Sequence, residues 1–95
     1  MQVKVSARHG HLGEEAHQLI EEKAGKLLHF FDRLTFIEVT VDFQKVEKAA
    51  EVIATAEHKH KFVGHASADD LMAAVGLAVD KAAQQIDQAL ALEPN

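Results

Sequence analysis

The sequence predicts an α+β fold, with one four-stranded mixed sheet and two roughly parallel helices on one of its faces, in the order β-α-β-β-β-α. Two observations indicate this class. Four segments alternate apolar and polar residues, as half-buried strands do, and two longer segments repeat apolar residues with helical spacing. A chain of 95 residues suits one domain and is too short for two. We therefore expect residues 1–95 to form a single domain.

The first strand and the first helix are predicted at residues 2–8 and 14–31. Val3 and Val5 alternate with polar neighbours, which is the period-2 pattern of a strand with one buried face. Two glutamates occupy the first turn of the helix, where the helix dipole favours anions. The apolar residues that share one face of this helix are Ala16, Leu19, Ile20, Ala24, Leu27, Phe30 and Phe31.

Three further strands are predicted at residues 35–45, 50–57 and 62–68. In the first of them, Ile37 and Val39 begin a clear alternation. The other two are weaker patterns because they contain alanine and glycine, which are poor strand formers.

The last element is predicted as a helix over residues 69–92. Ser67 or Asp69 is expected to cap its N-terminus, because both side chains can accept a hydrogen bond from a free backbone N–H group. Its apolar stripe consists of Leu71, Ala74, Val75, Ala78, Val79, Ala82, Ile86 and Ala89.

This order of elements predicts the topology of the sheet. A strand–helix–strand unit of this length normally makes a right-handed parallel crossover, and the next two strands then follow as an antiparallel meander. Because every apolar strand face must meet an apolar helix stripe, both helices are expected on one side of the sheet. The other side is then an open face that bears mixed residues, among them Lys4, Glu38, Thr40, Glu51, Thr55 and Ser67.

The composition excludes several classes of function. The net charge of −5 argues against broad non-specific binding of nucleic acid, but it allows a local basic patch. The absence of cysteine excludes disulfides, zinc–thiolate sites and thiol catalysis. No signal-peptide pattern opens the chain, and no apolar run approaches the ~20 residues of a membrane span. We expect a cytoplasmic protein without a membrane partner.

The segment "EHKHKFVGH", residues 57–65, holds three of the seven histidines. His58 and His60 could share one metal ion if the strand persisted, but they would need a third ligand, for which His29 is the candidate. The other His-x-His pair, at residues 9–11, is expected at the opposite end of the sheet. The alternatives are a solvated hairpin tip that discourages edge pairing, or a contact with phosphate.

No arrangement of residues in the sequence indicates an enzyme. We find no acid–base pair, nucleophile elbow or phosphate-cradling glycine loop, and the histidines are not predicted to converge. We therefore expect no catalytic residue, no metal site, no cofactor and no small-molecule substrate.

Lysines lie beside the apolar stripes of both helices. Lys23 projects within the stripe of the first helix, and Lys26 lies on its flank. Lys81 flanks the stripe of the second helix at a similar depth, which predicts a basic groove between the helices. The alternative is that these lysines extend their charged heads to water over an alanine-rich seam.

Six short motifs appear in an order that resembles a known family. They are "RH" (8–9), "EEKAGKL" (21–27), "FDRL" (31–34), "HASA" (65–68), "DLMAAV" (70–75) and "DKAAQQI" (80–86). Together they cover nearly the whole chain and resemble the ribosome hibernation-promoting factor and ribosome-associated translation inhibitor family, in its short form.

The resemblance implies a stress factor that binds the small ribosomal subunit, occupies the channel for messenger and transfer RNA, and blocks translation without catalysis. The partners would be the small subunit and its 16S ribosomal RNA. Carried over by position, the residues that would contact RNA are Arg8, Lys23, Lys26, Arg33 and Lys81.

The sequence departs from this family in the second helix. Family members commonly continue after the "DK" motif with several basic residues, whereas residues 82–95 contain none. Gln84, Asp87 and Gln88 stand where positive charge would be expected, and Met72 replaces the usual aromatic residue. The alternative function is therefore an acidic offshoot of the same fold that binds a protein partner and not the ribosome.

Overall fold

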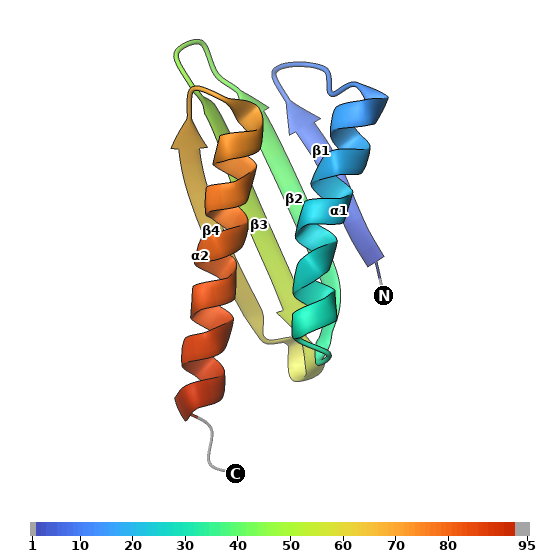
Figure 1. Ribbon diagram of the computed structural model, residues 1–95, viewed down its shortest axis with the longest axis vertical. Helices are drawn as coiled ribbons and strands as arrows, with labels where there is room; N and C mark the ends of the chain where they lie inside the picture. Colours follow the sequence, from blue (N-terminus) through green and yellow to red (C-terminus); the bar gives the residue numbers. More distant parts are fainter. Residues whose placement is uncertain (1, 93–95) are drawn as a thin grey trace.

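The computed structural model describes residues 2–92 and confirms the predicted α+β class, with the order β-α-β-β-β-α (Figure 1). A short 3₁₀ turn, η1, is the one addition within the described residues. The elements are β1 (Gln2–Arg8), α1 (Glu14–Phe30), β2 (Leu34–Phe43), β3 (Lys48–Ala56), η1 (Glu57–Lys59), β4 (Lys61–Ala68) and α2 (Leu71–Leu92).

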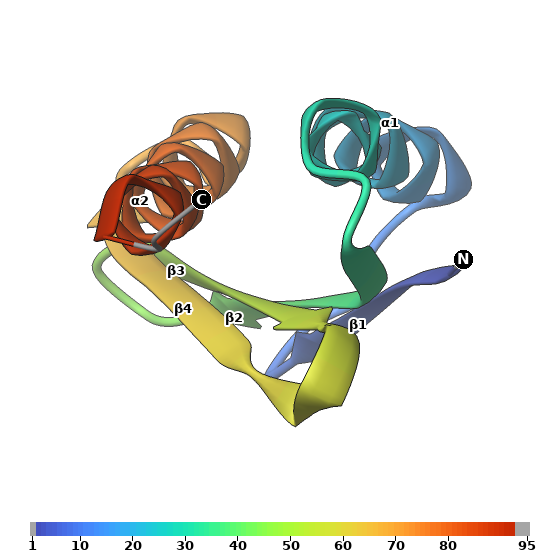
Figure 2. The same ribbon diagram turned by 90° about the horizontal axis from the view of Figure 1, so that it is seen from below.

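The four strands form one sheet in the order β1-β2-β3-β4. β1 pairs with β2 in parallel, and the other two pairings are antiparallel, as predicted. Both helices cover the same face of the sheet and run in the same direction (Figures 1 and 2). We call the end at which β1 and β2 finish the upper end, and the end at which β3 finishes and β4 begins the lower end.

The core lies between the sheet and the two helices. Ile20 of α1, Val39 of β2, Val52 of β3 and Val75 of α2 have no exposed surface. Burial of an aliphatic side chain of this size stabilises a fold by about 1.5–3 kcal/mol. No buried polar or charged side chain occurs among the described residues, so the core between the helices and the sheet is apolar.

Small residues in β4 let α2 approach the sheet closely. A Cβ atom built on Gly64 would lie 2.0 Å from the carbonyl oxygen of Ala78 and 2.7 Å from the backbone nitrogen of Ala82. The glycine and alanine residues that weaken the strand pattern in the sequence therefore form the surface on which α2 packs. Their low strand propensity is compensated by close packing between layers.

The second helix begins two residues later than predicted, and neither predicted residue caps it. The helix starts at Leu71, and Asp70 Oδ2 accepts a hydrogen bond of 3.0 Å from the backbone N–H of Ala73. Asp70 therefore occupies the N-cap position, in place of Ser67 or Asp69. A cap residue must directly precede the first helical turn, and only Asp70 does so.

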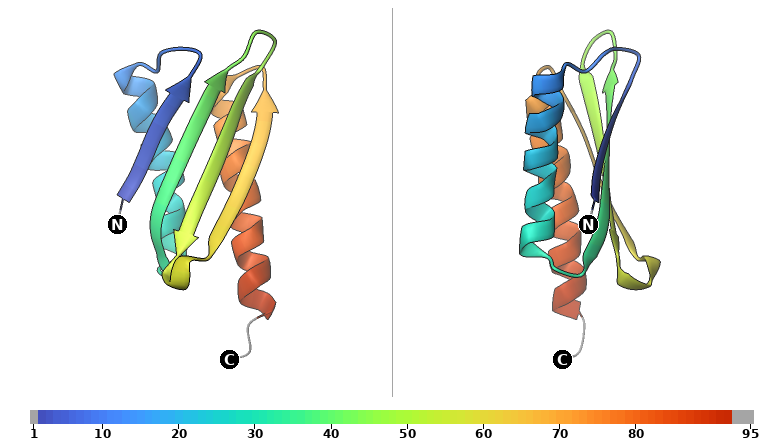
Figure 3. Two further views of the ribbon diagram at one scale, coloured as in Figure 1. Left: turned by 180° about the vertical axis from the view of Figure 1, so that it is seen from behind. Right: turned by 90° about the vertical axis from the view of Figure 1, so that its right-hand side faces the viewer.

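The β3–β4 connection bends away from the helices at the lower end (Figure 3). It contains η1, in which His58 has left-handed backbone angles (φ 65°, ψ 22°). Neither α1 nor α2, over the described residues, is long and apolar enough to cross a membrane.

Candidate nucleic-acid interface

Lys23 lies between the two helices. Its side chain is half-buried, and a Cβ atom built on Gly76 of α2 would lie 3.0 Å from Lys23 Cε and 3.6 Å from Nζ. The end of the lysine chain therefore rests against α2 where that helix has no side chain. No carboxylate of residues 2–92 lies within ion-pair distance of this ammonium group.

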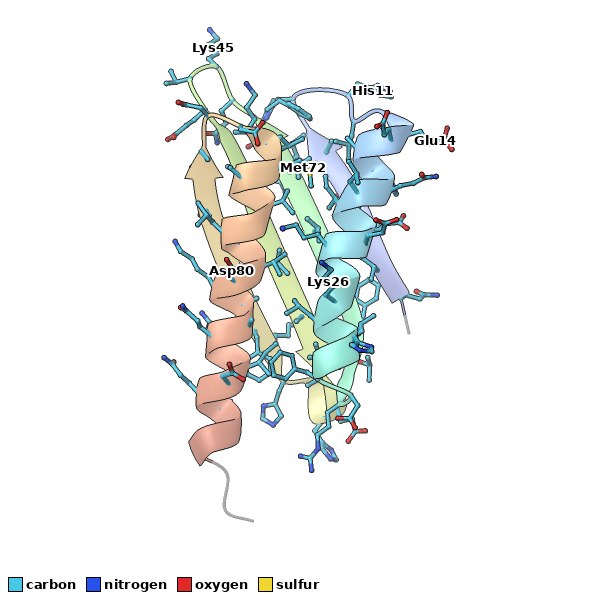
Figure 4. The ribbon with its side chains drawn as sticks, viewed as in Figure 1. His11, Glu14, Lys26, Lys45, Met72 and Asp80 are labelled. Atoms are coloured by element: carbon cyan, nitrogen blue, oxygen red, sulfur yellow. The ribbon has the colours of Figure 1, made fainter. Side chains whose placement is uncertain are left out.

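Lys26 extends the positive charge along the same helix. It is exposed and lies three residues after Lys23, on the surface of α1 that is turned away from the sheet (Figure 4). Residues three apart on a helix are neighbours on its surface. We call Lys23, Lys26 and Gly76 the interhelical seam. Asp80 of α2 is exposed on the same outer layer, and Glu22 of α1 is exposed one helical turn before Lys26, so acidic residues border the seam on both helices.

Lys81 does not lie in this seam, so the predicted groove between Lys23 and Lys81 is wrong. Lys81 Nζ donates a hydrogen bond of 3.1 Å to the carbonyl oxygen of His65 on β4. Lys81 follows Gly76 by five residues, which is a rotation of about 140° around the helix. It therefore faces the outer edge of the sheet, while Gly76 faces α1.

A second side chain of α2 binds the same edge. Gln85 Oε1 accepts a hydrogen bond of 3.1 Å from the backbone N–H of Val63. Lys81 and Gln85 are one helical turn apart. Lys81 donates to one backbone carbonyl on the outer edge of β4, and Gln85 accepts from one backbone N–H there; neither group is paired with another strand. Such groups on an edge strand would otherwise be available for pairing with another chain. Sequence reasoning missed Gln85, because nothing in the helical pattern identifies the strand beneath it.

Arg8 lies at the upper end, where β1 finishes, beside the carboxylate of Asp42 on β2. His9 Nδ1 is 2.8 Å from Asp42 Oδ1, and Gln44 Nε2 donates to Oδ2 over 3.3 Å. The hydrogen bond with His9, helped by Gln44 and by the positive charge of Arg8, lowers the pKa of Asp42 below its ordinary value of 3.8. The charge of Arg8 is therefore partly balanced by a neighbouring anion.

Arg33 lies at the lower end, in the turn between α1 and β2, and its side chain is exposed. Its carbonyl oxygen accepts a hydrogen bond of 3.1 Å from the backbone N–H of Glu57, which begins η1. The five predicted RNA-contacting residues are thus divided among four places: the seam, the upper end, the lower end and the β4 edge. They do not form one cluster.

The two His-x-His pairs lie at opposite ends of the sheet, as predicted. His29 belongs to the last turn of α1, whereas η1 bends toward the other side of the sheet (Figure 3), so His29 does not complete a site with His58 and His60. Among the described residues, no group of three or more histidines, aspartates and glutamates is placed to hold a metal ion.

Comparisons with known proteins agree with this fold. A family model described as "Sigma 54 modulation protein / S30EA ribosomal protein" matches residues 3–90. The chain is 30% identical over 95 residues to a ribosome hibernation promoting factor of Azotobacter vinelandii, covering 90% of this chain and 79% of that protein.

Two solved structures share the fold. A ribosomal subunit interface protein from Coxiella burnetii superposes with a TM-score of 0.85 at 18% identity, covering 96% of this chain and 99% of the other. The N-terminal domain of Protein Y from Thermus thermophilus superposes with a TM-score of 0.81 at 20% identity, covering 94% and 99%.

Proposed function

Because the chain belongs to the family described as Sigma 54 modulation protein / S30EA ribosomal protein, we propose that it binds the small ribosomal subunit and silences translation. In this proposal it occupies the channel for messenger and transfer RNA and contacts 16S ribosomal RNA. The role is one of occupancy without catalysis, in the cytoplasm. The similarity to a hibernation promoting factor supports the ribosome as partner.

The interhelical seam is the observation that carries this proposal. Lys23 holds an ammonium group over the backbone of α2 with no carboxylate of the described residues beside it, and Lys26 adds a second, exposed charge. A lysine held in this way has donors available for phosphate oxygens, which dominate the affinity of proteins for nucleic acid. The half-buried stem of Lys23 also fixes the position of its charge, so less side-chain freedom is lost on binding.

The remaining cations support binding from more than one side. Arg8 at the upper end, Arg33 at the lower end and Lys81 at the β4 edge are exposed on different parts of the surface. A protein enclosed by RNA in a channel can use all of them, whereas a protein on a flat surface could use only one group. The second half of α2 adds little attraction, because its exposed Gln84, Asp87 and Gln88 carry no positive charge.

Sedimentation with purified small subunits over a salt series tests the proposal. The test variant is Lys23→Gln with Lys26→Gln, and the matched control is Lys4→Gln with Lys45→Gln, which removes the same charge from exposed positions outside the seam. We expect the seam variant to bind about tenfold more weakly at low salt. The slope of its log affinity against log salt concentration should be less steep by about 1–2, because about one or two fewer counterions are released on binding. The control should stay within about twofold of wild type. Equal binding by the seam variant and the wild type would contradict the proposal.

A protein-binding role is the second candidate, and one observation favours it. Val63 is 39% exposed on the open face of the sheet, and Ile53 is its partner in the β3–β4 register. Phe36 is half-buried on the same face. A chain that stays free of small subunits at every salt concentration, but that retains one protein specifically, with loss of this retention in Val63→Glu, would support this role.

A further inference from the structure

Two short segments of this acidic chain combine lysine or arginine with histidine and together carry a formal positive charge. Residues 27–34 and 57–61 contain three lysines and arginines against two acidic residues, a formal charge of +1, so the rest of the chain carries −6. These two segments also hold three of the seven histidines. The segments are more than 20 residues apart in sequence, so their common charge is not evident from either one alone.

The fold joins the two segments at the lower end. Leu34 is the register partner of Ala56, and the carbonyl oxygen of Arg33 accepts the backbone N–H of Glu57 over 3.1 Å. A second hydrogen bond, of 2.7 Å from the N–H of Ala56 to the carbonyl oxygen of His60, closes the turn between β3 and β4.

Several side chains around this turn are exposed. We define the hairpin tip by four cationic or titratable residues, all of them exposed: Arg33, His58, His60 and Lys61. The tip bends toward the open side of the sheet, away from the helices (Figure 3). It is therefore a separate surface from the interhelical seam.

We propose that the hairpin tip is a second contact for the RNA backbone, and that this contact strengthens as the pH falls from neutral toward 6. The proposal rests on the proposed function, since it assigns the tip to the same partner. Lysine and arginine bind phosphate at any physiological pH. Histidine is the side chain that gains a positive charge between pH 8 and 5, and as a cation it donates from both ring nitrogens.

The permanent charges of the tip are balanced by neighbouring carboxylates, so a net positive charge there comes from protonated histidine. Asp32 of the turn after α1 and Glu57 of η1 are the acidic residues on the segments that form it, and both are exposed. On the side of the helices, His29 lies in the last turn of α1. β4 adds Lys61, and its register partner on β3, Thr55, is neutral. The two carboxylates are thus opposed by two permanent positive charges, those of Arg33 and Lys61. The other two tip residues are histidines, which are cations only when protonated.

The chemistry of the tip favours RNA over a lipid surface. The strongly exposed large apolar residues of the described chain are Leu19, Val46, Val63 and Leu77, and none of them belongs to the tip. A membrane-binding loop would present such a residue for insertion at the interface. Charged and histidine side chains without an apolar anchor suit a sugar–phosphate backbone.

The test compares association with small subunits at pH 7.5 and pH 6.0 and constant ionic strength. The test variant is His58→Asn with His60→Gln, because asparagine tolerates the left-handed angles at position 58. The control is His11→Gln with His65→Gln, two exposed histidines away from the tip. We expect wild-type binding to tighten about three- to tenfold at the lower pH. The test variant should lose most of this gain, and the control should keep it.

A second measurement separates this inference from the proposed function. Binding of a single-stranded RNA of about 20 nucleotides, followed by fluorescence anisotropy at low salt, requires only a phosphate backbone. If the wild type fails to bind subunits at either pH, the proposed function is wrong, and the RNA measurement still decides the role of the tip. Lys61→Gln should weaken RNA binding at both pH values. A pH-dependent gain that is unchanged in the His58→Asn, His60→Gln variant, in subunit or RNA binding, would overturn the inference.

Discussion

The side chain of Lys23 ends directly over Gly76, and this relationship links the two helices. A Cβ atom at position 76 would lie 3.0 Å from Lys23 Cε, closer than side chains ordinarily approach. The glycine therefore creates the space that the lysine occupies. An interior glycine makes a helix less stable than alanine would. Gly76 therefore lowers the stability of α2 while it leaves room for the charged end of Lys23.

Gly76→Ala should consequently have opposite effects on stability and on binding. We expect the free energy of unfolding to rise by about 0.5–1 kcal/mol, because alanine is the better helix former and only the flexible end of Lys23 has to move. Association with small subunits should weaken by about two- to fivefold because the ammonium group is displaced. Denaturant unfolding and sedimentation measure the two effects.

Gly25→Ala is the matched control for this experiment. Gly25 lies inside α1, and a Cβ atom there meets nothing within 4 Å. The same gain in helix propensity is therefore expected without any change in binding. If both variants bind subunits as the wild type does, Gly76 has no role in placing Lys23 for RNA.

Gly64→Ala should be strongly destabilising, because its Cβ atom would collide with backbone and not with a flexible side chain. The obstructing atoms are the carbonyl oxygen of Ala78 and the nitrogen of Ala82, at 2.0 and 2.7 Å. To admit a methyl group, α2 must move away from β4, and overpacking of this kind costs about 1–3 kcal/mol or more. The check is the denaturation midpoint of Gly64→Ala against that of Gly25→Ala. Equal stability of the two variants would show that α2 does not pack on β4 as closely as the structure indicates.

The contact between His9 and Asp42 predicts a dependence on pH. Because the folded chain lowers the pKa of Asp42 below 3.8, its ionised form stabilises the fold. That contribution is present above the ordinary pKa and is lost as the pH falls through the lowered value. His9→Ala should therefore raise the pKa of Asp42 toward 3.8, as measured by carboxyl NMR titration. Gln44→Ala, which removes a longer and weaker hydrogen bond, should raise it less. A larger change in Gln44→Ala would contradict this order of causes.

The sequence was sufficient to predict which segments form strands and helices, because the helical spacing and the alternation in the first two strands are clear, although the last two strands show a weaker pattern. It was not sufficient at positions that depend on how the elements meet. Lys81 lies at the margin of an apolar stripe, and a stripe has two margins that look alike in sequence. Since α2 covers the β3–β4 side of the sheet, the margin with Lys81 faces the outer edge, and the other margin faces α1. The cap was missed for a similar reason, because several polar residues precede the helix and the exact first turn decides among them.

The last prediction concerns the protected edge of β4. Gln85 accepts the N–H of Val63, and Lys81 donates to the carbonyl oxygen of His65. Gln85→Ala should expose the amide of Val63, so that its hydrogen exchange in the native state becomes faster. Gln84→Ala, one position away and exposed, should leave this exchange unchanged.

The combined Lys81→Met, Gln85→Ala variant leaves both groups on the edge unpaired. We expect it to self-associate at high concentration in sedimentation velocity, because free edges pair with other chains. A variant that stays monomeric, with unchanged exchange at Val63, would show that α2 does not protect this edge.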